Sequence, residues 1–244
     1  MEGRNILLFV IIVVLLMMVI RYVMKDANTL TGLVSGKSMQ TIEVSELASS
    51  TASGSTSNFT YSIWFFIDDW NYRYGEAKVI FGRMTTGSGE KEPCPSVVLG
   101  PIQNNIAVSL AVYPGQDEVP EHGDNFIVHN CPVANVPIQR WCNILISAYG
   151  RTLDLYLDGK LVRTCVLPGV AKIDSNAPVY ITPMGGFSGW TSRFQYWPES
   201  SDPQKAWNIY KAGYGGSLLG NLFGRYNVKV SLMDGDTEGK SWTV

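Results

Sequence analysis

The sequence predicts an all-β protein, an antiparallel sandwich, with an N-terminal transmembrane helix and one short helix towards its C-terminal end. Three observations lead to this prediction. Every residue from Ile6 to Ile20 is apolar. From Asn58 onward, apolar residues recur at every second position, as in strands that are buried on one face. The 24 glycines and 12 prolines of the chain interrupt this pattern at short intervals, which is typical of many short antiparallel strands.

Residues 5–24 are expected to form the membrane anchor. If Arg21 extends its charged end towards the lipid headgroups, the segment provides ~20 residues and ~30 Å of helix, enough to cross a bilayer core. A cleaved signal peptide would have a shorter apolar run and an Ala-x-Ala-like site, which the sequence after Arg21 lacks. A buried helix of a soluble domain would carry a polar stripe.

Two sets of residues give opposite indications of the side of the membrane on which the β domain lies. Arg21, Lys25 and Lys37 follow the anchor and only Arg4 precedes it, a bias that places the following domain in the cytosol. The sequon Asn58-Phe59-Thr60 and the four cysteines are typical of a lumenal domain instead. Because the sequon lies at the start of a strand, we expect the cytosolic side.

Residues 25–57 are expected to be a spacer. Residues 49–57 consist only of Ser, Thr, Ala and Gly, a composition typical of flexible linkers. Residues 41–47 are expected to be a short ordered segment within it.

The β domain is expected at residues 58–216. Its first strand places Phe59, Tyr61, Ile63, Phe65 and Ile67 on one face. Further strands are expected at residues 78–82, 96–99, 106–113, 126–129, 141–149, 153–157 and 161–166. The pair Asp158-Gly159 is typical of a two-residue hairpin turn, in which both residues need positive φ. Gly150-Arg151 forms the preceding turn, so residues 141–166 are expected to form a three-stranded meander.

One helix is expected after these strands. Asp202 is its N-cap, Pro203 its first residue and Gly213 lies just past its end. Its apolar face is expected to consist of Ala206, Trp207 and Tyr210.

Residues 217–244 are expected to form a C-terminal extension. An apolar cluster precedes a predicted β-hairpin, in which residues 225–233 pair with residues 241–244. The tail either completes the domain's own sheet or adds to the sheet edge of a neighbour. The candidate contact residues of this tail are Leu218, Leu219, Leu222 and Phe223.

The composition excludes several classes of function. The formal net charge is −2 and no basic block is present, so nucleic acid is not an expected partner. His122, His129 and the cysteines show no metal-ligand spacing, so neither a metal nor another cofactor is expected. The sequence has no Gly-x-Ser-x-Gly motif, and the histidines have no obvious Ser or Cys partner. We therefore expect no catalytic residues and no enzyme activity.

Among the cysteines, which are Cys94, Cys131, Cys142 and Cys165, three full pairings are possible. Cys142 opens the meander and Cys165 lies towards the other end of its third strand, which argues against their pairing. Cys131–Cys165 is the preferred disulfide, and Cys94 and Cys142 are then free or paired.

The loop after the first strand is the main candidate for contact with a ligand or partner. It consists of Asp68, Asp69, Trp70, Asn71, Tyr72, Arg73 and Tyr74. Trp, Tyr and Arg are enriched at protein interfaces, and aromatic rings beside Asp and Asn also suit a sugar. Alternatively, Trp70 and Tyr74 pack over the sandwich end. The Asp and Asn oxygens could bind calcium, but we prefer the interpretation that they cap their own turns.

Several segments resemble laminin-G-like, concanavalin A-like lectin domains, in the same order along the chain. Residues 59–65 resemble the opening strand of these domains, Arg140-Trp141 and residues 153–162 their central hairpin, and residues 187–190, 194–197 and 202–213 their closing strand and helix. The resemblance implies a jelly-roll sandwich of two antiparallel sheets. The Glu-x-Asp-x-x-Glu run of glucanases with this fold is absent, so a β-glucan hydrolase is only a remote alternative.

A narrower resemblance covers nearly the whole chain. The anchor, the Ser/Thr spacer and residues 69–76, 154–166 and 207–216 resemble membrane-anchored virion proteins of large algal DNA viruses. This implies a non-enzymatic minor capsid component that tethers the inner membrane to the capsid shell. Its partners would be the bilayer and capsid proteins, and it would lie in the virion inner membrane, facing the capsid, on the host cytosolic side during assembly. The alternative is a membrane-anchored lectin that binds glycans.

Overall fold

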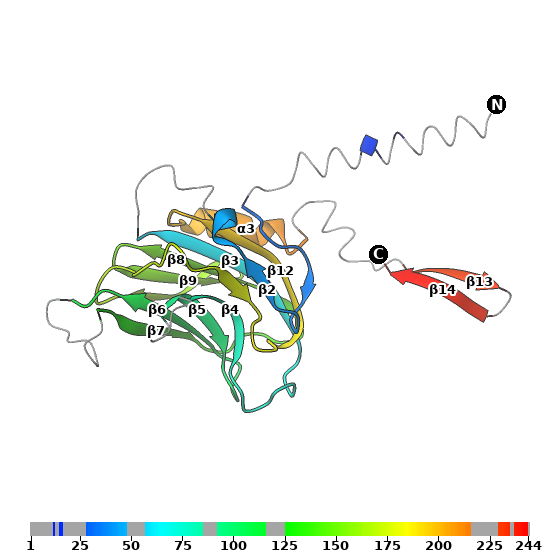
Figure 1. Cartoon of the computed structure of the whole chain (residues 1–244), viewed down its shortest axis with the longest axis horizontal. Coiled ribbons are helices and arrows are strands. Elements are labelled where there is room, and N and C mark those ends of the chain that lie inside the picture. The colour runs from blue at the N-terminus through cyan, green and yellow to red at the C-terminus, as the bar shows by residue number, and fades with distance from the viewer. Residues whose placement is uncertain are drawn as a thin grey trace.

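The fold is an antiparallel sandwich of two six-stranded sheets, as the sequence predicts (Figure 1). A computed structural model describes residues 12, 15–16, 28–47, 57–84, 92–115, 125–215, 229–234 and 237–243. The first sheet contains, in spatial order, β1 (Val34–Ser35), β12 (Ser188–Trp197), β3 (Phe59–Asp69), β8 (Trp141–Tyr149), β9 (Thr152–Leu157) and β10 (Lys160–Val166). The second contains β2 (Gln40–Ile42), β11 (Val179–Ile181), β4 (Lys78–Met84), β5 (Pro93–Leu99), β6 (Ile106–Val112) and β7 (Ile127–Val133).

The main core lies between the two sheets. The alternate residues of β3 that the sequence places on one face are all buried in it, with Ile63 and Phe65 fully inaccessible to solvent. Aromatic rings gather at its centre, where Tyr61 lies 5.8 Å from both Phe81 and Phe194 between ring centroids. This dry interior accounts for the strand pattern, because burial of one face selects apolar residues at every second position.

The meander of β8, β9 and β10 is confirmed, and so is the turn at its end. Asp158 and Gly159 have φ of 51° and 73°, as a two-residue turn between right-twisted strands requires. The Asp158 carboxylate accepts a hydrogen bond from the backbone N–H of Asn143 at 2.9 Å and pairs with Arg140. The turn is therefore tied to the start of β8.

Helix α3 (Pro203–Ala212) covers the outer face of the first sheet (Figure 1). Its predicted caps are confirmed: the Asp202 side chain accepts a hydrogen bond from Lys205 N at 2.6 Å, and Gly213 has φ 73°. The predicted apolar face is partly wrong. Ala206 and Ile209 are the buried residues, whereas Trp207 is 39% exposed, because its ring extends over the β9–β10 turn instead of onto the sheet.

The predicted spacer is wrong for residues 28–47, which belong to the sandwich. Strand β1 pairs with β12, and β2 pairs with β11. Ile42 and Leu47, the latter in the short helix α2 (Val44–Leu47), are buried in the main core, so the ordered segment expected at residues 41–47 exists as part of the domain. The Ser/Thr-rich residues 49–57 consequently connect α2 to β3 within the domain, and residues 48–56 lie outside the described part.

The predicted anchor lies almost wholly outside the described residues. Only Ile12, Leu15 and Leu16 of it are described, and they are helical and more than half exposed. Within the described residues, the structure contains no helix of sufficient length and apolarity to span a membrane. The anchor therefore remains a prediction.

The predicted C-terminal hairpin is present as a two-stranded sheet of β13 (Lys229–Asp234) and β14 (Thr237–Thr243). Its turn is tighter than predicted, because β14 begins at Thr237 and pairs there with Asp234. The apolar cluster expected before it, from Leu218 to Phe223, lies outside the described residues.

Candidate functional site

The sandwich has two distinct ends. The "loop end" consists of residues 36–39, 70–77, 100–105, 134–140, 158–159 and 182–187, since β3, β5, β7, β9 and β11 all finish there and their partners begin there. The "entry end" is where the chain joins the fold. Asn28 O accepts a hydrogen bond from Tyr196 N at 3.3 Å, near the finish of β12. Strand β12 runs from one end to the other, so the two ends are ~30 Å apart.

Large apolar side chains are exposed at the loop end. They come from different loops and are 42–69% exposed: Met39, Tyr74, Ile102, Ile138 and Met184. Scattered exposed apolar residues are ordinary on a soluble surface, whereas a group gathered at one end is typical of an interaction site.

A hollow of about 590 Å³ lies within this end. Trp70 forms one wall, and its indole N–H donates to Ile102 O at 3.1 Å, which fixes the ring. The other lining residues are apolar or carry neutral amides: Ile102, Gln103, Asn104, Asn105, Ala134, Asn135 and Ile138. An aromatic wall with several amide donors and acceptors can hold an uncharged polar ligand or a protein loop.

Arg73 and Tyr72 join two loops of the loop end by hydrogen bonds. The Arg73 guanidinium donates to Met184 O at 2.5 Å and Gly186 O at 3.3 Å, and pairs with Glu76. The Tyr72 hydroxyl donates to Gly185 O at 3.1 Å. Both side chains thus bind the β11–β12 loop of their own domain and support it, and their contact with a partner stays a prediction.

The acidic residues of the loop fit the turn-capping interpretation. Asp69 Oδ1 accepts a hydrogen bond from Asn71 N at 2.9 Å, which is an Asx turn, and Asp68 is exposed. Among the described residues, no three His, Cys, Asp or Glu side chains gather in a way that could hold a metal.

Lys78 is buried beneath the loop end. Lys78 is 2% exposed, and its ammonium lies 5.0 Å from the Trp70 ring centroid, with no hydrogen-bond partner among the described residues. Burial, followed by the nearby Arg73 charge, lowers the pKa of Lys78. The contact with the indole face partly compensates the ammonium for lost hydration, so Trp70 has a second role in covering this charge.

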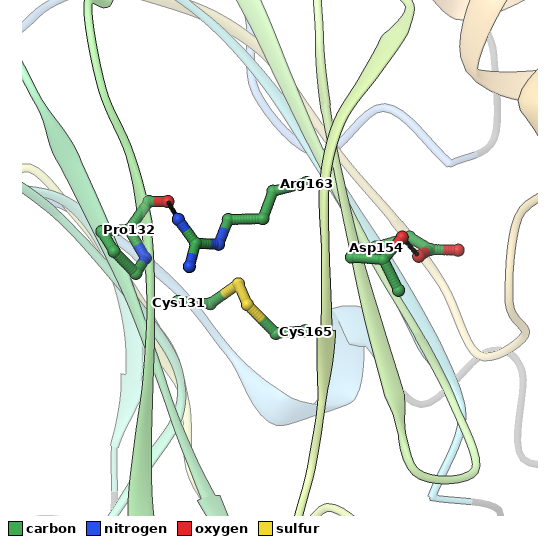
Figure 2. The surroundings of a disulfide bond; sticks show 6 residues. Cys131, Pro132, Asp154, Arg163 and Cys165 are labelled. Atoms are coloured by element: carbon green, nitrogen blue, oxygen red, sulfur yellow. Dashed lines mark hydrogen bonds between the residues drawn. A yellow bond between two sulfur atoms is a disulfide. The ribbon is translucent and has the colours of Figure 1, made fainter.

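The predicted disulfide between Cys131 and Cys165 is present, with 6.2 Å between the Cα atoms (Figure 2). It joins β7 to β10, which are edge strands of different sheets. Beside it, Arg163 donates to Pro132 O at 3.2 Å, and on the outer face Thr164 donates to Asp154 at 2.5 Å. One side of the sandwich is therefore closed covalently.

Cys94 and Cys142 are free and buried. Burial raises the pKa of Cys94 to about 12 and that of Cys142 to about 11. A catalytic thiol needs a lowered pKa, so neither side chain has the character of a nucleophile.

No protein-family model matches the sequence, and no curated protein matches it. Two binding domains of botulinum neurotoxins are among the solved structures that resemble this one. The binding domain of botulinum neurotoxin serotype D/C, strain VPI 5993, is 14% identical with a TM-score of 0.51, over 75% of this chain and 46% of that one. The binding domain of botulinum neurotoxin DC in complex with rat synaptotagmin II is 12% identical, covering 75% and 42%, with a TM-score of 0.49. The first likeness shows a shared β-sandwich fold, and this chain spans less than half of either structure.

Proposed function

We propose that the protein is a non-enzymatic structural component of a virion, a minor capsid protein that connects the inner membrane to the capsid shell. The observation that carries the proposal is the difference between the two ends of the domain. The chain enters the sandwich at one end, and the exposed apolar side chains gather at the other, ~30 Å away. That the domain would connect an inner membrane to a capsid shell is inferred from the sequence resemblance to membrane-anchored virion proteins.

The connection between the bilayer and the sandwich would be short and stiff. With residues 5–24 in the bilayer, only residues 25–27 separate the anchor from Asn28, where the fold begins. The entry end then faces the membrane and the loop end faces the capsid. Residues 28–35 run along β12 and are tied to it by Leu30 N donating to Phe194 O at 2.8 Å, so the spacing between membrane and shell is set by the sandwich itself.

The loop end suits a protein partner. Met39 and Met184 are unbranched and adaptable, as is common at binding surfaces, and Tyr74 and Ile102 stand 59% and 60% exposed around the Trp70 hollow. Capsid proteins are therefore the expected partners at this end, on the host cytosolic side during assembly.

Aspartate at the loop end is expected to reduce the amount of protein in purified particles at least tenfold. The variant is Ile102→Asp with Met184→Asp, which puts charges into an apolar contact. The amount is measured by quantitative mass spectrometry of particles, relative to the major capsid protein.

The matched control is Tyr149→Asp, because Tyr149 is the last residue of β8 and is 65% exposed at the entry end. It should be incorporated normally. Equal incorporation of both variants, or absence of the wild-type protein from particles, would refute the proposal.

Glycan binding is a second candidate function, and the Trp70 hollow favours it. A sugar ring could stack on the indole while Gln103, Asn104 and Asn135 exchange hydrogen bonds with its hydroxyls. On a glycan array, the protein is expected to bind a discrete set of sugars, and Trp70→Ala should abolish that binding while Tyr149→Ala leaves it intact. Absence of any binding above background would rule this candidate out.

A further inference from the structure

Within the described residues, one long edge strand of the sandwich has neither a further strand nor a proline to protect it. The edge strands are β1 and β10 in one sheet and β2 and β7 in the other. Strands β1 and β2 have only 2 and 3 residues, and β7 contains Pro132, which cannot donate to a further strand. Strand β10 has 7 residues and no proline. An exposed edge of this kind is a template for strand addition.

Apolar side chains accompany this open edge. Leu161 lies opposite Tyr156, which is buried beneath α3, and Val166 lies on the same face opposite Thr152. Leu161 is 51% exposed and Val166 is 71% exposed. The half-exposed Trp207 is close by, since a Cβ on Gly159 would lie 3.0 Å from its ring. A strand added to β10 would cover this surface.

The C-terminal hairpin lacks a third strand within the described structure. Strands β13 and β14 pair only with each other in the described structure, and an isolated two-stranded hairpin is marginally stable in water. Both of its outer edges therefore have main-chain groups that a third strand could pair with. The six residues of β13 nearly match the seven of β10 in length.

Charge favours an antiparallel pairing of β13 with β10, and the length of the connection permits it. The hairpin turn is acidic, with Asp234, Asp236 and Glu238, and this orientation places it beside the exposed Lys160 at the start of β10. Before the hairpin, Tyr214 stacks on Trp141 of β8 at 4.5 Å between ring centroids. Strand β10 is two strands, or ~10 Å, away from β8. An antiparallel β13 would start beside Val166, a further ~20 Å along β10. Residues 215–229 can extend over ~45 Å, which is enough to cover both distances.

We propose that β13 adds to β10 of the same chain, antiparallel, as a further strand of the first sheet. The short connection gives an effective concentration in the millimolar range, so that the chain's own edge is filled before that of a neighbour. The hairpin then covers the β10 edge, which would otherwise be open to strand addition by another molecule. This inference does not depend on the proposed function.

Paired cysteines test the contact in the full chain in detergent micelles. Thr164→Cys is combined with Ser231→Cys in β13 or, as the matched control, with Ser241→Cys in β14. Ser231 and Ser241 are direct cross-strand neighbours, so the two variants differ only in the strand that carries the thiol. Under mild oxidation, Thr164→Cys should cross-link to Ser231→Cys at least fivefold faster than to Ser241→Cys, and the product should keep the mass of a monomer. Slow cross-linking at both positions, faster reaction at Ser241→Cys, or a dimeric product would overturn the proposal.

Hydrogen exchange provides a second, independent readout. In a chain that ends at residue 215, or in full-length Leu232→Asp should that truncation fail to fold, the amides of β10 should exchange at least tenfold faster than in the wild type. The amides of β7, the proline-protected edge, should be unaffected. Unchanged exchange in β10 would also overturn the proposal.

Discussion

Replacing Cys131 and Cys165 together by serine is expected to lower the free energy of unfolding by about 4 kcal/mol. The bond closes a loop with a sequence separation of 34, and the chain-entropy relation for a loop of that length gives about this value. The loop comprises the turn after β7 and the whole meander of β8, β9 and β10. Without the disulfide, the edge strands β7 and β10 would no longer be joined covalently.

The measurement is thermal unfolding of the full chain in detergent, followed by near-ultraviolet circular dichroism of the buried aromatic residues. A loss of 4 kcal/mol should lower Tm by roughly 10 °C for a domain of this size. Reductant should lower the Tm of the wild type similarly and leave that of the double variant unchanged. If reductant has no effect on the wild type, the predicted contribution of the bond is wrong.

The disulfide between Cys131 and Cys165 also bears on which side of the membrane the domain lies. Stable disulfides are rare in the cytosol, whereas the proposed placement is cytosolic during assembly. That placement requires Cys131 and Cys165 to be reduced when the protein is first made and oxidised only later, for example in released particles. Alkylation of thiols in infected cells and in particles distinguishes the two states, and a bond already complete in newly made protein would argue for a lumenal domain.

The sequence predicts the long strands well because each places apolar side chains at alternate positions into the main core. Strands β3 and β8 contain enough alternating residues to establish a period of two, and Asp158-Gly159 fixes the turn of the meander through its positive φ. Strands β1, β2 and β11 have 2, 3 and 3 residues, too few for any period. The sequence therefore predicts a spacer at residues 28–47, and with it a flexible reach that the fold does not have.

The candidate site was predictable only in part. The aromatic composition of residues 70–74 is visible within one segment, so the sequence alone already indicates this loop as a candidate. The exposed Met184 and Ile138 come from loops far away in sequence, and only the sheet topology brings them to the same end. The role of Arg73 was also beyond sequence reasoning, since its partners are backbone carbonyls of residues 184 and 186, which carry no sequence pattern.

The protein is expected to lose stability steeply at alkaline pH, by about 4 kcal/mol between pH 9 and 11. Burial raises the pKa of Cys94 from 9.0 to about 12 and that of Cys142 from 9.0 to about 11. Above pH 9 the unfolded chain releases both thiol protons while the folded chain retains them. The folded state then binds more protons, so the free energy of unfolding falls as pH rises. Burial also raises the pKa of Tyr61, which steepens the loss above pH 10.

Isothermal unfolding by denaturant at half-unit steps from pH 8 to 11 measures this loss, and Cys94→Ala with Cys142→Ala identifies its source. Alanine at two buried positions lowers stability at every pH through lost packing, so the slope against pH is the informative quantity and not the absolute value. The slope of the double variant between pH 9 and 10 should be less than half that of the wild type, because its two thiol protons are gone and Tyr61, with an ordinary pKa of 10.0 in the unfolded chain, is only half ionised by pH 10. Equal slopes in the two proteins would mean that the buried thiols are not responsible for alkaline unfolding.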